Sequence, residues 1–184
     1  MQGLARTKGF FRENGFKSGI HICDTIQDVQ EVADKMLGKH LVLPHQNEDG
    51  LMCNSVLVME HLEIEKQYFL AISLDVKSGQ PVITYSDVGG LSYARLCQLY
   101  PERIYHHQID FDKGIDFVNL AQVADKLGIY ESSRISFMIK NLYECFLQRD
   151  CLSIIINPLV VTPARKFIAA NTQIRLDEDA LYRQ

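Results

Sequence analysis

The apolar run from Cys151 to Ile156 is the feature that most constrains the fold of this chain. Only Ser153 interrupts the run, and three consecutive isoleucines end it. Isoleucine is β-branched and favours strands, and a strand that is apolar on both sides has to be covered on both faces. Just before the run, apolar residues recur at helical spacing over Ser132–Gln148. The sequence therefore predicts a helix that leads into a strand buried on both sides.

Further elements are predicted along the rest of the chain. Apolar spacing indicates helices, the first with Asp24 or Thr25 as its N-cap, at Asp24–Leu37, Leu91–Leu99 and Phe117–Leu127. Strand-like runs are expected at Ser55–Ile64, Gln67–Asp75, Pro81–Tyr85, Ile104–Ile109 and Lys166–Ala170. The first two runs are close enough to predict a hairpin, and His45–Gly50 is expected to be a polar turn. This order predicts an α+β fold, in which helices pack on a mixed or antiparallel sheet.

Composition limits the classes of function. A chain of 184 residues with 47% hydrophobic content suits one domain, or one domain with a small lobe. The net charge of -4 supplies no basic excess for nucleic acid, and the apolar runs fall far short of the ~20 residues that cross a bilayer. We therefore expect no nucleic-acid partner and no membrane insertion. The 5 cysteines show no C-x-x-C spacing, which predicts free thiols in a reducing compartment.

The basic amino-terminal segment leaves two interpretations open. Arg6, Lys8, Arg12 and Lys17 have only Glu13 as a counter-charge, as in an organelle transit peptide. A glycine-punctuated loop explains the same residues, and the segment lacks an amphipathic stripe.

The carboxy-terminal part contains a series of ordered motifs. It reads Ile154-Ile155-Ile156-Asn157-Pro158-Leu159-Val160, then Phe167-Ile168-Ala169-Ala170-Asn171, and finally Asp179-Ala180-Leu181-Tyr182-Arg183-Gln184. In order and spacing these motifs closely resemble the β subunit of succinate-CoA ligase (succinyl-CoA synthetase). The family reads E-I-N-P-L-V, then L-D-A-K or L-D-G-K, then N-A-L-F-R-Q. Similar residues fall at Gly38-Lys39, Gly89-Gly90 and Ala124–Gly128, so the resemblance covers nearly the whole chain.

The resemblance implies an ATP-grasp-like fold for residues 1–184, as a partial domain that lacks the family's carboxy-terminal CoA-ligase domain. Residues 20–110 would correspond roughly to the nucleotide lobe, and residues 111–184 to the portion that bears the metal site. The family is an acid-CoA ligase of the tricarboxylic acid cycle that uses Mg²⁺ with ATP or GTP. Its β subunit pairs with an α subunit, which carries the phosphorylated histidine. The implied location is the mitochondrial matrix in a eukaryote and the cytoplasm otherwise.

The resemblance also implies nucleotide-binding positions, several of which are changed. The family loop G-R-G-K-G falls on Ala5–Gly9, so Lys8 and Gly9 are the expected phosphate-loop residues. Two acids of the family's nucleotide side fall on Met59 and Gln67. Glu60 could replace the first acid after a one-residue slip, but a slip in a strand turns the side chain to the opposite face.

The implied metal position is changed as well. The glutamate of E-I-N falls on Ile155, and the aspartate of L-D-A-K falls on Asn171, so Asn157 alone is retained. Magnesium in proteins is usually held by one or two carboxylates together with substrate phosphates. We therefore expect Asn157 and Asn171 to be weak metal ligands, and we assign no catalytic residue.

Three functions stay open at this point. The chain is expected to be a degenerate ATP-grasp domain, a pseudoenzyme that does not catalyse the ligase reaction on its own. Alternatively, it is the nucleotide- and magnesium-binding part of an active succinate-CoA ligase that other chains complete. A third possibility is a structural subunit of a larger, mitochondrial assembly, whose unpaired strand edges and apolar surface a partner covers.

Overall fold

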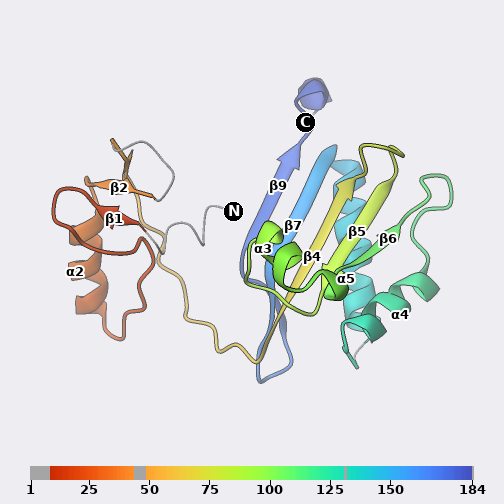
Figure 1. Ribbon diagram of the computed structural model, residues 1–184, viewed down its shortest axis with the longest axis horizontal. Helices are drawn as coiled ribbons and strands as arrows, with labels where there is room; N and C mark the ends of the chain where they lie inside the picture. Colours follow the sequence, from red (N-terminus) through yellow and green to blue (C-terminus); the bar gives the residue numbers. More distant parts are fainter. Residues whose placement is uncertain (1–8, 44–48, 131, 184) are drawn as a thin grey trace. The chain divides into compact units, whose positions relative to one another are not determined.

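The chain divides into two compact units in the computed structural model, which describes residues 9–43, 49–130 and 132–183 (Figure 1). The units are Met1–Leu62 and Glu63–Gln184. The expected division into residues 20–110 and 111–184 separates a nucleotide-binding portion from a metal-binding portion, and it stays a prediction. No helix among the described residues is long and apolar enough to cross a membrane.

The first unit combines one helix with three short strands. β1 (Phe10–Phe11), β2 (His40–Val42) and β3 (Leu51–Met52) form an antiparallel sheet in that order. The helix α2 (Ile26–Met36) begins with a capping box, in which Thr25 and Asp28 each bind the backbone amide of the other. The expected cap at Thr25 is thus confirmed. A small core consists of Phe11, Met36, Leu41 and Leu43.

The expected strand over Ser55–Ile64 is wrong, and so is its hairpin. The segment has no regular secondary structure, and Leu57, Val58 and Met59 are 87%, 64% and 61% exposed. Alternating apolar residues favour a strand only where neighbouring strands and a buried face receive them. The chain reaches the sheet of the second unit only at Glu65, whose amide donates to the Val161 carbonyl at 2.8 Å. Most of the expected turn at His45–Gly50 lies outside the described residues.

The second unit is built on a sheet whose strand pairs are all antiparallel. The strands follow the order β6-β5-β4-β7-β8, and β9 also pairs with β7. Their bounds are β4 (Lys66–Leu74), β5 (Pro81–Ser86), β6 (Tyr105–Gln108), β7 (Cys151–Val161), β8 (Phe167–Ala169) and β9 (Thr172–Leu176). The sequence left a mixed or an antiparallel sheet open, and the sheet is antiparallel. The strand expected at Lys166–Ala170 is confirmed as β8, which pairs with β7.

Helices cover both faces of this sheet. The helices α4 (Phe117–Lys126) and α5 (Ser132–Gln148) pack on one face, where Ile154 and Ile156 of β7 are buried. The helix α3 (Tyr93–Leu99), followed by the 3-10 turn η1 (Pro101–Arg103), lies on the other face (Figure 1). There Leu96 packs in one cluster with Ile155. The prediction that this strand is covered on both sides is therefore confirmed.

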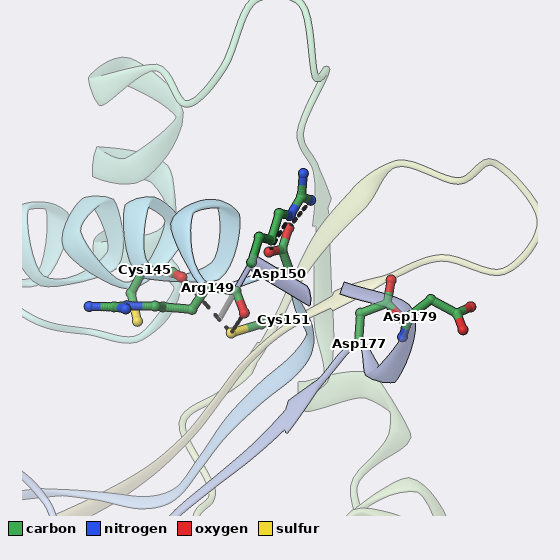
Figure 2. A network of polar contacts seen from close by, with 7 residues as sticks. Cys145, Arg149, Asp150, Cys151, Asp177 and Asp179 are labelled. Atoms are coloured by element: carbon green, nitrogen blue, oxygen red, sulfur yellow. Dashed lines mark hydrogen bonds and ion pairs between the residues drawn. The ribbon is translucent and has the colours of Figure 1, made fainter. Parts of the chain in front are cut away.

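Polar contacts hold the corner between α5 and β7 to the 3-10 segment η2 (Glu178–Arg183) (Figure 2). The Asp150 carboxylate pairs with the guanidinium of Arg183, whose Nε donates to Asp150 Oδ2 at 2.9 Å. The Asp177 amide donates to the Asp150 carbonyl at 2.8 Å. All of the cysteines are free, as expected, and burial raises the pKa of the Cys151 thiol, which disfavours a reactive thiolate.

Candidate functional site

The side chain of Asn157 lies where the loop after β5 passes across the sheet. Its Oδ1 accepts a hydrogen bond from the Gly90 amide at 2.8 Å, and its Nδ2 donates to the Leu91 carbonyl at 2.6 Å. One residue earlier, the Gly89 amide donates to the Gln67 carbonyl at 2.9 Å. The loop therefore starts beside β4 and ends above β7, so it has to cross β4.

The two glycines of this loop have different reasons to be glycine. A Cβ on Gly89 would lie 2.5 Å from the Tyr68 carbonyl oxygen, so the loop backbone crosses β4 where no side chain fits. Gly90 has φ +79°, a left-handed conformation that costs other residues energy. A Cβ on Gly90 would also collide with the side-chain amide of Gln67. Gln67 and Asn157 thus flank the same glycine.

Asn157 and Asn171 are joined directly. The Asn157 amide donates to the Asn171 carbonyl at 2.9 Å, and Asn171 Nδ2 donates to the Asn157 carbonyl at 3.0 Å. The register between β4 and β7 shifts next to Asn157: Tyr68 pairs with Leu159, whereas Leu70 pairs with Ile156. Such a bulge re-aims side chains, and here it accompanies the contact of Asn157 with the loop. The structure therefore brings together Gln67, Asn157 and Asn171.

Ile155, which the resemblance predicts to stand in place of a glutamate, faces an apolar environment. It pairs with Ala71 of β4 and packs against the cluster of Phe69, Ala71 and Leu96. Leu96 of α3 is fully buried there, and Ile155 is half-buried. An alkyl group in apolar surroundings is thus what the structure has at this predicted metal position.

The residues at this site do not fit a magnesium ion. Mg²⁺ takes oxygen ligands in octahedral geometry and favours carboxylates. Here the expected ligands are the neutral amides of Asn157 and Asn171, and the Asn157 oxygen already accepts one hydrogen bond from Gly90. Ile155 supplies no oxygen ligand. Over the described ranges, no group of three or more His, Cys, Asp or Glu side chains is placed to hold a metal ion.

Sequence reasoning missed Asp87, an acid at the start of this loop. Arg103 Nε donates to Asp87 Oδ1 at 2.9 Å, and a second guanidinium nitrogen contacts Oδ2. Burial raises the pKa of Tyr68, and the negative charges of Asp87 and Glu65 raise it further, so the phenol stays neutral. The Gly89-Gly90 pair was a signal for a turn, but nothing in the sequence linked it to Asn157.

The other expected nucleotide residues belong to the first unit. Lys8 lies outside the described residues. Gly9 is buried, and a Cβ on it would lie 2.8 Å from the Val42 carbonyl oxygen, so packing against β2 requires glycine there. Met59 and Glu60 are exposed and belong to no strand. Glu60 therefore has no strand face, and a one-residue slip there would not turn its side chain to an opposite face of a sheet.

Comparison with known proteins places these residues in a family. The chain matches the ATP-grasp domain family over residues 4–161. It is 34% identical over 181 residues to the mitochondrial GDP-forming succinate-CoA ligase β subunit of Dictyostelium discoideum, covering 97% of this chain and 43% of that protein. The ADP-forming β subunit of Opitutus terrae is 32% identical, with 97% of this chain and 46% of that protein covered. The chain thus spans less than half the length of these relatives.

A solved structure supports the fold. ATP citrate lyase from Methanothrix soehngenii, in complex with citrate and coenzyme A, superposes with a TM-score of 0.59 at 16% identity. That similarity covers 89% of this chain and 36% of the lyase chain. The chain therefore belongs to the ATP-grasp domain family, and its sequence relates it to succinate-CoA ligase β subunits.

Proposed function

We propose that this chain is a succinate-CoA ligase β-subunit-like ATP-grasp domain that does not catalyse the ligase reaction on its own. The observation that carries the proposal is Ile155, which packs against Leu96 where the family resemblance implies a magnesium-binding glutamate. An alkyl group can neither bind a magnesium ion nor compensate its charge. The neighbouring asparagines supply neutral amides, which compensate the charge of a dication less than carboxylates do.

The direct test is an assay for succinyl-CoA. The purified chain would be combined with a succinate-CoA ligase α subunit, succinate, CoA, Mg²⁺ and either ATP or GTP. We expect no product above the background of the α subunit alone. A β subunit from one of the relatives, mixed with the same α subunit, is the positive control. Turnover by this chain above background would refute the claim of inactivity.

The alternative is that the chain is the nucleotide- and magnesium-binding part of an active ligase that other chains complete. It is supported by Asn157 and Asn171, which two hydrogen bonds through the Asn157 backbone keep side by side at the expected metal position. Isothermal titration with Mg-ATP and Mg-GTP distinguishes the two proposals. Tight, magnesium-dependent binding would favour the active ligase, whereas the degenerate domain should show weak binding or none.

A structural subunit is the third possibility, and exposed apolar residues favour it. Ile174 of β9 is 54% exposed, and Leu181 and Tyr182 of η2 are 65% and 83% exposed. The proposed partner is a ligase α subunit or a larger protein assembly, in the mitochondrial matrix of a eukaryote or in the cytoplasm of a bacterium. Native mass and co-purifying chains test this function, and a stable monomer would count against it.

A further inference from the structure

We propose that Asn157 is a lock: its carboxamide holds the loop 87–91 against β4, and it stays on the loop when Mg²⁺ and ATP are added. This inference deepens the function proposed above, because it concerns the same site. It assigns to Asn157 a positioning role, which is different from the role of metal ligand that the family resemblance implies.

The carboxamide matches the loop in both directions. Its oxygen accepts from the Gly90 amide at 2.8 Å and its nitrogen donates to the Leu91 carbonyl at 2.6 Å, so one side chain satisfies a donor and an acceptor of consecutive residues. The site is partly buried, and leaving these backbone groups unpaired would carry a desolvation cost. Alanine offers neither group, and aspartate offers only acceptors.

Other contacts fix the start of the loop but not its end. Gly89 is held by the Gln67 carbonyl, Val88 donates to Ser86 Oγ at 3.1 Å, and Asp87 pairs with Arg103. Beyond Gly89, the hydrogen bonds to Gly90 and Leu91 come from Asn157. Loss of Asn157 should therefore release the second half of the loop and leave the first half in place.

The end of the loop also determines where α3 begins. Ser92 follows Leu91 directly and is the N-cap of α3, with its hydroxyl accepting from the Arg95 amide at 3.4 Å. The same helix brings Leu96 onto Ile155. By fixing the loop, Asn157 therefore also helps to place the helix that covers Ile155. The Gly90 amide uses one of the two lone pairs of the Asn157 oxygen, so the first role of this side chain is to position the loop.

Hydrogen exchange of the wild-type chain, followed by NMR, tests the lock without a ligase assay. The Gly90 amide should exchange at least ~30-fold more slowly than in the unfolded chain, the factor expected for two ordinary hydrogen bonds. Adding Mg²⁺ with ATP should leave that rate unchanged. An unprotected Gly90 amide would overturn the proposal. So would faster exchange on addition of Mg-ATP, because the carboxamide would then leave the loop for the ion.

The Asn157→Ala variant provides the second arm, with Asn141→Ala on the exposed side of α5 as the matched control. We expect Asn157→Ala to accelerate exchange at Gly90 by about 30-fold, while amides of β4 and β5 keep their protection. Asn141→Ala should change neither. Unaltered Gly90 exchange in a folded Asn157→Ala protein would refute the lock. If that variant does not fold, the wild-type measurement still decides. Ligase activity, present or absent, affects neither arm, so failure of the lock and failure of the proposed function are distinguishable.

Discussion

Among single residues, Tyr143 of α5 has a buried hydroxyl group without a hydrogen-bond partner among the described residues. Its ring is 4% exposed. A buried, unpaired hydroxyl costs about 1–3 kcal/mol. Tyr143→Phe should therefore raise the free energy of unfolding in urea melts by about 1 kcal/mol. Tyr130→Phe, at a fully exposed position, should leave it unchanged. A loss of stability in Tyr143→Phe would contradict the prediction.

Glu13 in the first unit should make stability depend on acid pH. Its carboxylate accepts from the His40 ring Nδ1 at 2.6 Å and from the His40 amide at 2.9 Å, and these bonds lower the pKa of Glu13 from 4.5 to about 2. Because the folded pKa is the lower one, the pair stabilises the unit above about pH 4.5, and this contribution is lost as the pH falls towards 2.

The His40→Ala variant tests this dependence. It removes the ring bond, which is the largest cause of the shift, so the pKa of Glu13 should rise towards 4.5. NMR titration of the Glu13 carboxyl group measures the change, with the exposed Glu60 carboxyl as the reference. A Glu13 pKa that stays near 2 in the variant would show that another group causes the shift.

At the scale of elements, β7 and the bend between β8 and β9 carry Ile155 and Asn171, the two positions where the resemblance predicts that a carboxylate has been lost. Ile155→Glu with Asn171→Asp would place two carboxylates beside Asn157. Without metal, the double variant should be roughly 2 kcal/mol less stable than the parent, since the new glutamate is partly buried among apolar groups. Mg-ATP should recover part of that loss, because a ligand that binds only the folded state stabilises it.

Thermal melts with and without Mg-ATP measure this recovery. Each single variant should show little ligand-dependent shift, because one carboxylate supplies neither the charge nor the geometry that magnesium requires. Ile174→Glu with Leu176→Asp, exposed positions farther along β9, adds the same charges away from Asn157 and Asn171. If Mg-ATP raises the melting temperature of the double variant no more than that of this control, Ile155 and Asn171 are not what prevents magnesium binding. The cause would then lie at Asn157 or in the segment around Lys8.

At the scale of the whole molecule, the two units differ greatly in the size of their cores. Among the described residues, the core of the first unit is the small cluster of Phe11, Met36, Leu41 and Leu43, whereas the main cluster of the second draws on β4, β5, β7, α4 and α5. Small cores supply little stability on their own. The first unit should therefore unfold at a lower temperature than the second, and the transition of the whole chain should not be two-state.

Limited proteolysis can check this difference. Leu57 and Met59, both exposed in a segment without regular structure, offer chymotrypsin a cleavage site near the end of the first unit. Early cleavage there should leave a resistant fragment that begins near Glu63. A single cooperative melt, with no preferential cleavage before Glu63, would contradict independent unfolding of the units.

Local periodicity explains why most elements were predictable from the sequence. Helix α5 has the expected bounds, because its apolar face recurs over 17 residues. The strand predicted at Cys151–Ile156 extends to Val161 through Asn157 and Pro158, whose polar and cyclic side chains gave no strand signal. The strands β1, β2, β3 and β9 are short or polar, and their partners lie elsewhere in the chain, so they were missed.

The sequence by itself determined which residues are present at the site: the alignment of motifs assigned Ile155, Asn157 and Asn171 to the positions of the family's metal ligands. The tertiary structure decided what these side chains contact. The hydrogen bonds of Asn157 reach Gly90 and Leu91, more than 60 residues earlier, at separations of 67 and 66 positions. No local pattern encodes such a contact, because it depends on the register shift of β7 and on a loop that crosses β4 where only glycine fits.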